Sequence, residues 1–294
     1  MTDFNFITEI PANEQLSFDK FIQDARKKHI VSPKETVSIV LSEQHDLMNS
    51  LTASHDVSQV IRDLREEAYK SFLKQEAQMN AYILKHLAEK FAFPRSQFSQ
   101  LLTLFEHDEG SLETKLQHFF GDFSGLVYPY IYRLSLSNTQ SRRSRAGKVF
   151  EGIIYGLYEA LGYPFESQAS VGSNNFKSKK LGKIVDSLLP SLESFEMRRD
   201  KVILGTMKTT LRERWQEVVE EINRTGLPRI YLLTVDEDIS ESKVEQMANH
   251  NVILVVYSEV KATLALRNKM NVVSFEDYFF DEIPQALSYW ERAR

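Results

Sequence analysis

The sequence predicts an α/β protein, with a mixed five-stranded sheet flanked by helices and a mainly helical N-terminal region. In the second half of the chain, apolar strand-like segments alternate with amphipathic helical patterns, as in sheets covered by helices. The first half consists mostly of helix-forming residues with apolar positions three or four apart. We therefore expect a helical region over residues 1–121 and an α/β core over 122–294, unless the two form one compact domain.

The bulk composition is that of a soluble globular protein. The 294 residues can bury a sizeable core, and 42% of them are hydrophobic while 26% are charged. No apolar run approaches the ~18 residues of a membrane span, and residues 1–6 lack the features of a secretion signal. Cysteine is absent, which excludes disulfides and thiolate metal sites. We expect a cytoplasmic protein with no membrane partner.

Helices are expected throughout the first half. A long helix is predicted over about 57–93 and is expected to end at Pro94. Shorter helical patterns cover 97–106 and 111–120. Before all of these, residues 37–41 could form a short strand.

The second half begins with a predicted helix over 144–161, which Gly162 ends. The strand candidates are, in order, 165–170, 183–189, 201–208, 229–235 and 251–257. The helical patterns that separate or follow the later strands are 211–223, 240–249 and 275–290. The last two strand candidates are continuously apolar, as in strands that are covered on both faces.

The third strand candidate ends on Lys208 and leads directly into an amphipathic helix. Because side chains alternate along a strand, Lys208 and Thr206 point to the same face. In many nucleases the residue two before such a lysine is an acid that binds metal, so the missing carboxylate must come from elsewhere. On the following helix, Glu221 lies closest to the buried face, whereas Glu217 and Glu220 are better explained as solvated charges.

Two further acids could complete this set. Asp186 lies in an apolar strand candidate, where a carboxylate is costly unless it is paired or binds a cation, although it could equally just end the strand. Glu151 lies on the preceding helix and, taken alone, is best explained as a surface residue. With Lys208 and Glu221 they make a chemically sensible set, because carboxylates can hold one or two Mg²⁺ ions. The lysine could orient the attacking water or stabilise a phosphate oxyanion.

Basic residues gather near this set although the net charge is −5. One cluster consists of Arg142, Arg143, Arg145 and Lys148. A second cluster consists of four lysines within residues 177–183. A single cluster is best explained as a solvated face, but two that flank one site favour an anionic ligand.

The helix after Lys208 opens with Arg212, Glu213 and Arg214. Arginine can donate two hydrogen bonds to guanine, and glutamate can accept one from cytosine, so this triplet suits G·C base pairs. The glycine-rich motifs of nucleotide-binding loops and the nucleophile elbow of hydrolases are both absent. The chemistry therefore points to a metal-dependent nuclease whose cleavage and base recognition lie side by side.

The sequence resembles the type II restriction endonucleases of the EcoRII, SsoII and PspGI group, which cut DNA at CC-x-GG sites. The resemblance covers roughly residues 128–280. It is carried by residues 141–151, the strand with Asp186 and residues 204–215, with further matches beginning at Leu232 and Val272. One departure is Val185, where several relatives have proline.

The resemblance implies a PD-(D/E)xK nuclease fold with a displaced second acid. It implies that Asp186, Lys208, Glu221 and Glu151 are catalytic, and that the three acids among them bind Mg²⁺. It likewise makes Arg212, Glu213 and Arg214 the recognition triplet, with the cluster at 142–148 as further DNA contacts.

The same resemblance implies a homodimer on near-palindromic double-stranded DNA and a cognate DNA methyltransferase in the same system. The helical region at 1–121 would contact DNA or mediate dimerisation. Some relatives flip a nucleotide against an aromatic wall, for which Tyr82, Phe91, Phe93 and Phe98 are candidates, although each is better explained as core. Two alternatives stay open: a repair or recombination nuclease of the same fold, and a catalytically dead DNA-binding regulator, which the intact acids and lysine disfavour.

Overall fold

The computed structural model describes residues 6–44, 51, 53–172, 181, 184–212 and 214–293. The chain forms two compact units, each assembled from two separate stretches of sequence. The first unit consists of Met1–Ser32 and Tyr69–Arg145, and the second of Pro33–Ala68 and Ala146–Arg294. Each unit buries its own hydrophobic core.

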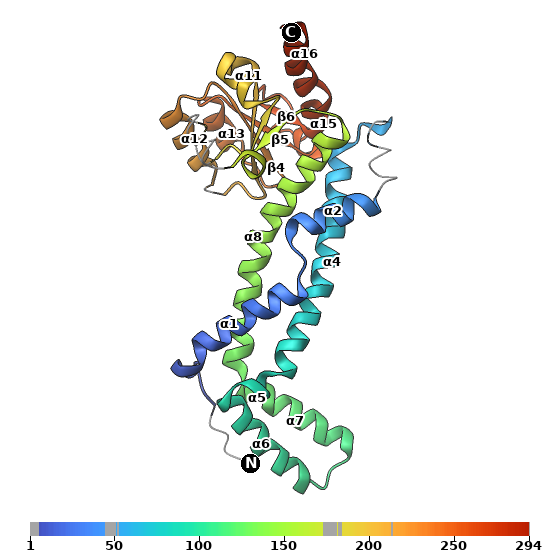
Figure 1. Cartoon of the computed structure of the whole chain (residues 1–294), viewed down its shortest axis with the longest axis vertical. Coiled ribbons are helices and arrows are strands. Elements are labelled where there is room, and N and C mark those ends of the chain that lie inside the picture. The colour runs from blue at the N-terminus through green and yellow to red at the C-terminus, as the bar shows by residue number, and fades with distance from the viewer. Residues whose placement is uncertain are drawn as a thin grey trace. The chain divides into compact units, whose positions relative to one another are not determined.

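Among its described residues, the regular elements of the first unit are all helices, as predicted for the N-terminal region (Figure 1). Its helices are α1 (Ala12–His29), α5 (Leu87–Lys90), α6 (Ala92–His107), α7 (Leu112–Leu126) and parts of α4 (Val57–Lys85) and α8 (Tyr128–Ala160). The predicted long helix ends at Lys85, and Pro94 lies in the first turn of α6. Proline is tolerated there because the first N–H groups of a helix have no intrahelical acceptor.

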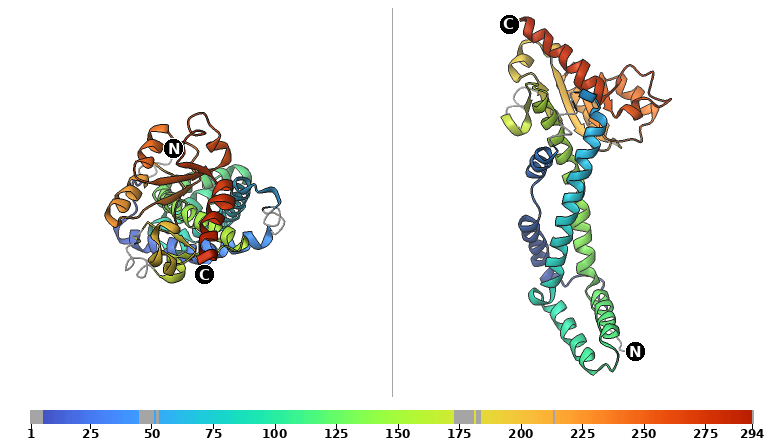
Figure 2. Two further views of the ribbon diagram at one scale, coloured as in Figure 1. Left: turned by 90° about the horizontal axis from the view of Figure 1, so that it is seen from above. Right: turned by 90° about the vertical axis from the view of Figure 1, so that its right-hand side faces the viewer.

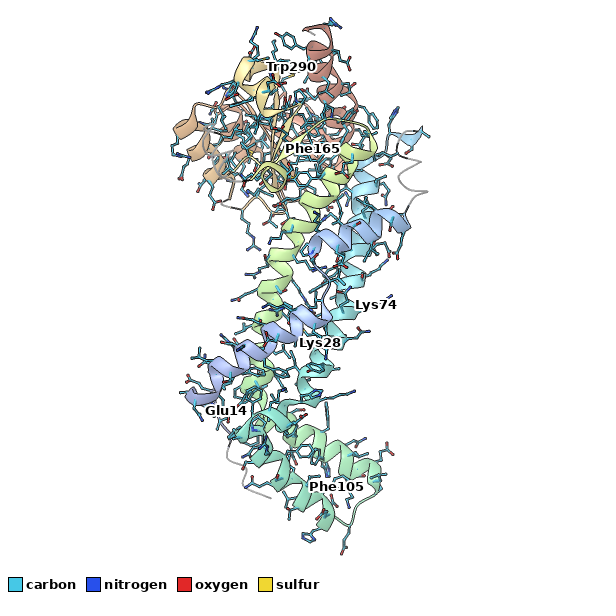
Figure 3. The ribbon with its side chains drawn as sticks, viewed as in Figure 1. Glu14, Lys28, Lys74, Phe105, Phe165 and Trp290 are labelled. Atoms are coloured by element: carbon cyan, nitrogen blue, oxygen red, sulfur yellow. The ribbon has the colours of Figure 1, made fainter. Side chains whose placement is uncertain are left out.

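Aromatic rings form the centre of this unit. Phe18 contacts Phe91 and Tyr130 edge to face, with ring centroids 5.4 and 5.1 Å apart. The Tyr130 hydroxyl donates to the carboxylate of Glu14 at 2.6 Å, and the same carboxylate accepts from the main-chain N–H of Phe93 at 3.0 Å. Glu14 lies on α1, where Figure 3 labels it. Phe91 is therefore a core residue, as its sequence context suggested.

The strand that residues 37–41 could have formed is a helix instead. Helix α2 (Pro33–Glu43) buries Thr36, Val37 and Val40, which are spaced for one helical face. Its side chains approach the backbone of α8 in the second unit closely, because a Cβ at Gly152 would lie 3.0 Å from Val37. A helical contact surface thus outweighs the strand propensity of these residues.

The second unit contains a mixed sheet of six strands. They are β1 (Glu166–Ser167), β2 (Ser187–Leu189), β3 (Ile203–Lys208), β4 (Ile230–Thr234), β5 (Val252–Val256) and β6 (Val272–Ser274), paired in that order. The pairs β1–β2 and β2–β3 are antiparallel, whereas the pairs from β3 to β6 are parallel. The sheet has one strand more than predicted. The additional strand, β6, was missed because it is only three residues long and directly precedes a helix.

Helices cover both faces of this sheet. The helices that connect successive parallel strands, α12 (Arg214–Thr225) and α13 (Glu241–Ala248), lie on one side (Figure 1). The C-terminal part of α8 lies on the other side (Figures 1 and 2). Every residue of β4 is buried, as predicted for a strand covered on both faces.

The remaining described elements are α9 (Gln168–Val171), α11 (Leu192–Met197), the 3₁₀ turn η1 (Arg199–Lys201), α14 (Ser258–Lys261), α15 (Phe275–Asp277), the π-helical turn η2 (Tyr278–Glu282) and α16 (Ile283–Ala293). None of the described helices has the length and apolarity that crossing a membrane requires.

Candidate active site at the end of β3

The predicted catalytic lysine ends the central strand of the sheet. Lys208 is half-buried and pairs in register with Thr234 of the parallel strand β4. Asp186 immediately precedes β2, which runs antiparallel to β3, and its main-chain N–H donates to the Gly205 carbonyl at 2.8 Å. Strand pairing therefore brings Asp186 to the same end of β3 as Lys208.

The carboxylate of Asp186 is held by β3 itself. Its Oδ2 accepts from the main-chain N–H of Met207 at 2.7 Å and from the Thr206 hydroxyl at 3.3 Å. Thr206 stands where many nucleases have an acid, and here it donates a hydrogen bond to the remaining acid. The main-chain carbonyl of Asp186 accepts from the Tyr155 hydroxyl at 2.9 Å.

Helix α8 supplies Glu151 to the same place. Glu151 and Tyr155 are four residues apart and so share one face of the helix. The neighbouring face carries Gly152 and Gly156, where α2 packs closely: a Cβ at Gly156 would lie 2.4 Å from Leu41. The close approach of α2 fixes the α8 turn that carries Glu151.

Electrostatics show that these side chains interact. The pKa of the Glu151 carboxyl is raised to about 7 by burial and by the charge of Asp186, against the lowering effect of the charges of Lys208 and Lys148. Burial also raises the pKa of Asp186, against the lowering effects of Lys208 and of the hydrogen bonds from Met207 and Thr206. Two half-buried carboxylates beside one ammonium group suit the binding of a cation and a phosphate. Glu151 is thus not the isolated surface residue that its local sequence suggests.

The other predicted site residues lie after Lys208. Arg212 is exposed, Glu213 lies outside the described residues, and Arg214 begins α12. Glu221 belongs to α12, but its side chain and that of Arg214 are outside the description. The predicted apolar stripe of this helix is buried at Trp215, Val218 and Ile222. Among the described side chains, no group of three or more acids or histidines forms a metal site, so Glu151 and Asp186 stand as a pair.

Sequence reasoning missed two residues at this site, Tyr155 and Asp236. Tyr155 could have been found from its position one helical turn after Glu151. Asp236 follows β4, and its Oδ2 accepts from the main-chain N–H of Leu211 at 2.7 Å. Asp236 could have been found from its position just beyond a strand whose parallel neighbour ends on Lys208. The carboxyl ends of parallel strands share one edge of a sheet, so the two residues are expected to lie close together.

In the predicted basic cluster on α8, two arginines bind other groups of the protein, whereas Arg143 and Lys148 extend toward solvent. Arg142 donates to the Glu76 carboxylate, and Arg145 is buried, donating to the Val31 carbonyl at 2.7 Å. Burial lowers the pKa of Arg145. Arg143 and Lys148 are exposed. The lysines at 177–180 and 183 lie outside the described residues.

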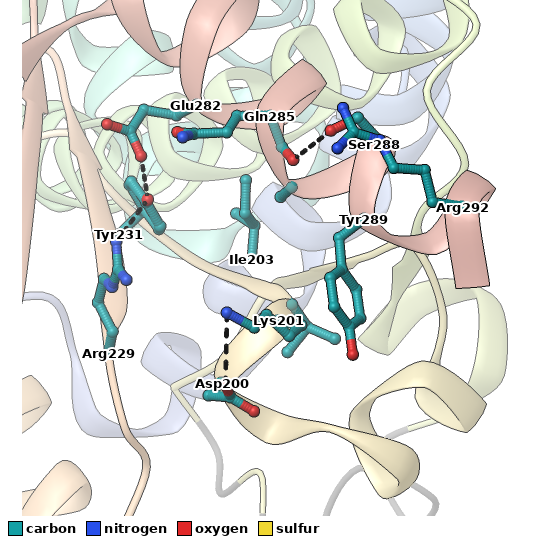
Figure 4. Close-up of a pocket in the computed structure, with 12 residues that line it drawn as sticks. Asp200, Lys201, Ile203, Arg229, Tyr231, Glu282, Gln285, Ser288, Tyr289 and Arg292 are labelled. Atoms are coloured by element: carbon teal, nitrogen blue, oxygen red, sulfur yellow. Dashed lines mark hydrogen bonds and ion pairs between the residues drawn. The ribbon is translucent and has the colours of Figure 1, made fainter.

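A cavity of about 600 Å³ lies at the opposite end of the strands (Figure 4). Its lining includes Ile203, at the start of β3, and Tyr231, near the start of β4. The Tyr231 hydroxyl donates to Glu282 at 2.5 Å. Because β3 runs from Ile203 to Lys208, this cavity is separated from the acid–lysine cluster by the length of the strand.

The chain is similar to known proteins in both sequence and fold. The family model described as EcoRII C terminal matches residues 109–279. The type II restriction enzyme SsoII from Shigella sonnei is 33% identical over 262 residues, which cover 88% of this chain and 79% of that enzyme.

Among solved structures, metal-depleted Ecl18kI in complex with uncleaved DNA has a TM-score of 0.75 and 29% identity, over 93% of this chain and 85% of that chain. The complex of the restriction endonuclease PspGI with substrate DNA has a TM-score of 0.60 at 18% identity, over 90% of this chain and 96% of that chain, and supports the fold alone. These likenesses confirm the predicted fold class.

Proposed function

Because the chain belongs to the EcoRII C-terminal family of type II restriction endonucleases, we propose that it cuts double-stranded DNA with Mg²⁺ at a short, near-palindromic site with a CC-x-GG core. As a site-specific deoxyribonuclease, it needs one place that binds the scissile phosphate and another that selects the bases. The observation that carries the proposal is the cluster of Glu151, Asp186 and Lys208, directly followed in the chain by the triplet that begins at Arg212.

The donor set fits a hard divalent cation. Glu151 and Asp186 provide two half-buried carboxylates whose pKa values are both raised by their partial removal from water, which is the situation that a bound cation relieves. Mg²⁺ is commonly held by one or two carboxylates together with phosphate oxygens and water. Glu221, which the sequence assigns as a third ligand, is proposed on its position in α12 alone. When bound, Mg²⁺ supplies Lewis acidity that favours deprotonation of water and offsets charge on the phosphate.

The protein side chains then have separate tasks. The Lys208 ammonium lies at the end of β3, where it can donate to a non-bridging phosphate oxygen and stabilise the charge that develops there. Thr206 and the N–H of Met207 fix the rotamer of Asp186. Tyr155 holds the main chain of Asp186, so that the carboxylate stays aimed at the same point.

Base selection is assigned to Arg212, Glu213 and Arg214. In this proposal the arginines donate to guanine and the glutamate accepts from cytosine, with each good pair contributing about 1–3 kcal/mol of discrimination. A homodimer supports recognition of two half-sites, since two-fold protein symmetry mirrors a near-palindrome. The solved complex of Ecl18kI with uncleaved DNA supports DNA as the ligand.

Phosphate contacts are proposed for the basic cluster on α8. Arg143 and Lys148 are exposed and suit this role best. Arg142 and Arg145 stay predicted contacts, although both already bind protein groups. We further propose that the first unit contacts DNA or mediates dimerisation, and that a cognate methyltransferase protects the host site.

The lysine provides the decisive test of the nuclease site. Lys208→Ala is expected to reduce cleavage of a CC-x-GG duplex by about 100-fold or more, while the duplex is still bound, because an oxyanion donor is lost. Lys201→Ala is the matched control: this lysine lies in η1, just before the other end of β3, and pairs with Asp200. Cleavage that survives Lys208→Ala, or falls equally in both variants, contradicts the assignment.

The metal and the site are tested with DNA of known sequence. Cleavage is expected to stop in EDTA and to return with added Mg²⁺, and the mapped ends are expected to lie at CC-x-GG sites. Arg212→Ala is expected to weaken binding to that duplex far more than binding to unrelated DNA at the same salt concentration. Equal losses on both duplexes would rule out a base-reading role for Arg212.

A further inference from the structure

Asp236 contacts the stretch of chain between the lysine and the recognition triplet. It lies two residues beyond the end of β4, and its Oδ2 accepts from the main-chain N–H of Leu211 at 2.7 Å. Its Oδ1 accepts from the N–H of Asp238 at 3.2 Å, and its own N–H donates to the Thr234 hydroxyl at 3.1 Å. Both carboxylate oxygens are therefore in use, and the aspartate is itself fixed to the strand end.

The backbone that Asp236 holds has an unusual conformation. Arg212, the residue after Leu211, has a φ of +24°, which residues other than glycine rarely adopt. Such conformations cost energy and persist only where the surroundings fix the chain. Leu211 is fixed twice, because its side chain is fully buried and its N–H donates to a carboxylate. Arg212, by contrast, is exposed.

Strand pairing links this anchor to the catalytic cluster. Lys208 pairs with Thr234 in the parallel β3–β4 ladder, so the chain leaves both strands at the same edge of the sheet. Leu211 follows three residues after Lys208, and Asp236 two residues after Thr234. The hydrogen bond between Leu211 and Asp236 therefore connects the two segments that follow β3 and β4.

We propose that Asp236 is a positioning residue for sequence recognition: its carboxylate holds the backbone at Leu211 so that Arg212 meets the bases in fixed register with Lys208. This inference rests on the proposed function, which assigns base recognition to the triplet. Asp236 touches neither DNA nor metal in this role. It acts through the main chain of the segment that carries the reader.

Asp236→Asn tests the role because an amide keeps the shape of the side chain but offers only one acceptor oxygen for two N–H donors. Binding and cleavage are measured at fixed salt on a CC-x-GG duplex and on duplexes with one core base pair exchanged. For each measurement we compare the value on the CC-x-GG duplex with the value on the exchanged duplexes. This ratio is expected to fall at least about tenfold, since a hydrogen bond to a charged group is lost. Asp238→Asn is the control, because it removes the same charge two residues away.

Asp238 is exposed, and its side chain forms no hydrogen bond or ion pair with the described residues, so Asp238→Asn is expected to keep the wild-type ratio. If Asp236 is purely structural, Asp236→Asn will lower stability, or will weaken binding to every duplex by the same factor. Either result without a change in the ratio overturns the proposal. If Asp236→Asn does not fold, Thr234→Val provides the second test. It removes the hydroxyl that holds the Asp236 N–H, and an unchanged ratio would again overturn the proposal.

Arg212→Ala, measured in parallel, separates this inference from the proposed function. If the wild-type enzyme does not prefer the CC-x-GG core, or Arg212→Ala keeps that preference, the recognition assignment itself fails. If Arg212→Ala loses the preference and Asp236→Asn keeps it, only the positioning role of Asp236 fails.

Discussion

Replacing Gly205 by alanine should damage both the sheet and the active site. Gly205 of β3 pairs with Ser187 of β2, and a Cβ at residue 205 would lie 2.4 Å from the Ser187 hydroxyl oxygen. An ordinary contact requires about 1 Å more. Both residues are buried within the sheet, so the clash is relieved either by rotating the Ser187 hydroxyl against its packed surroundings or by moving one strand away from the other.

Overpacking of this kind costs about 1–3 kcal/mol of unfolding free energy, which lowers Tm by roughly 2–12 °C for a unit of this size. The same movement displaces Asp186, because its N–H donates to the Gly205 carbonyl at 2.8 Å. A displacement of about 1 Å at a catalytic group can slow the reaction about 100-fold. Gly205→Ala should therefore lose more activity than its stability alone explains.

The assay is a double-mutant cycle with Ser187→Ala, followed by thermal unfolding and by single-turnover cleavage. In the double variant the new methyl group faces Cβ of residue 187, 3.8 Å away, which is an ordinary contact. Stability and cleavage should both recover most of their loss. If Gly205→Ala unfolds at the wild-type temperature, or if the two substitutions are additive, the steric argument is wrong.

Three smaller predictions follow from single hydrogen bonds. Tyr155→Phe removes the donor to the Asp186 carbonyl, and single-turnover cleavage should slow while duplex affinity stays unchanged. Ser58→Ala leaves Glu276 without its hydroxyl donor, and unfolding in denaturant should show a loss of about 1–3 kcal/mol. Trp290→Phe removes an indole N–H that donates to a carbonyl of η1 at 2.9 Å, which should cost about 1 kcal/mol by the same measurement.

The fold was predictable where one periodicity dominated over many residues. The buried strands β4 and β5 and the amphipathic helix α12 lie close to their expected positions, since continuous apolar runs and a 3.6-residue stripe are strong local signals. The prediction for residues 37–41 was wrong because a segment with four apolar residues among five suits either a strand or a helix, and only packing against Gly152 and Gly156 decides between them. The strand β6 was missed because three residues carry no measurable period.

The site was predictable to the extent that strand alternation places side chains. The face shared by Lys208 and Thr206 follows from β3 alone, whereas the hydrogen bond from Thr206 to Asp186 depends on the antiparallel partner β2. Glu151 shows the limit most clearly. Nothing in its helix distinguishes it from a surface acid, because its raised pKa arises from burial and from Asp186, which lies 35 positions later in the sequence.

The strand β3 explains why cutting and base choice should be difficult to separate in this enzyme. Its Gly205 carbonyl and Met207 N–H hold Asp186, its last residue is Lys208, and the chain that follows carries Arg212. The neighbouring strand β4 then fixes that following chain through Asp236. A shift of β3 relative to either neighbour would disturb the geometry that relates the acid, the lysine and Arg212, the proposed base reader. Substitutions that alter specificity without loss of cleavage are therefore expected beyond Leu211, where the chain has left this strand pair.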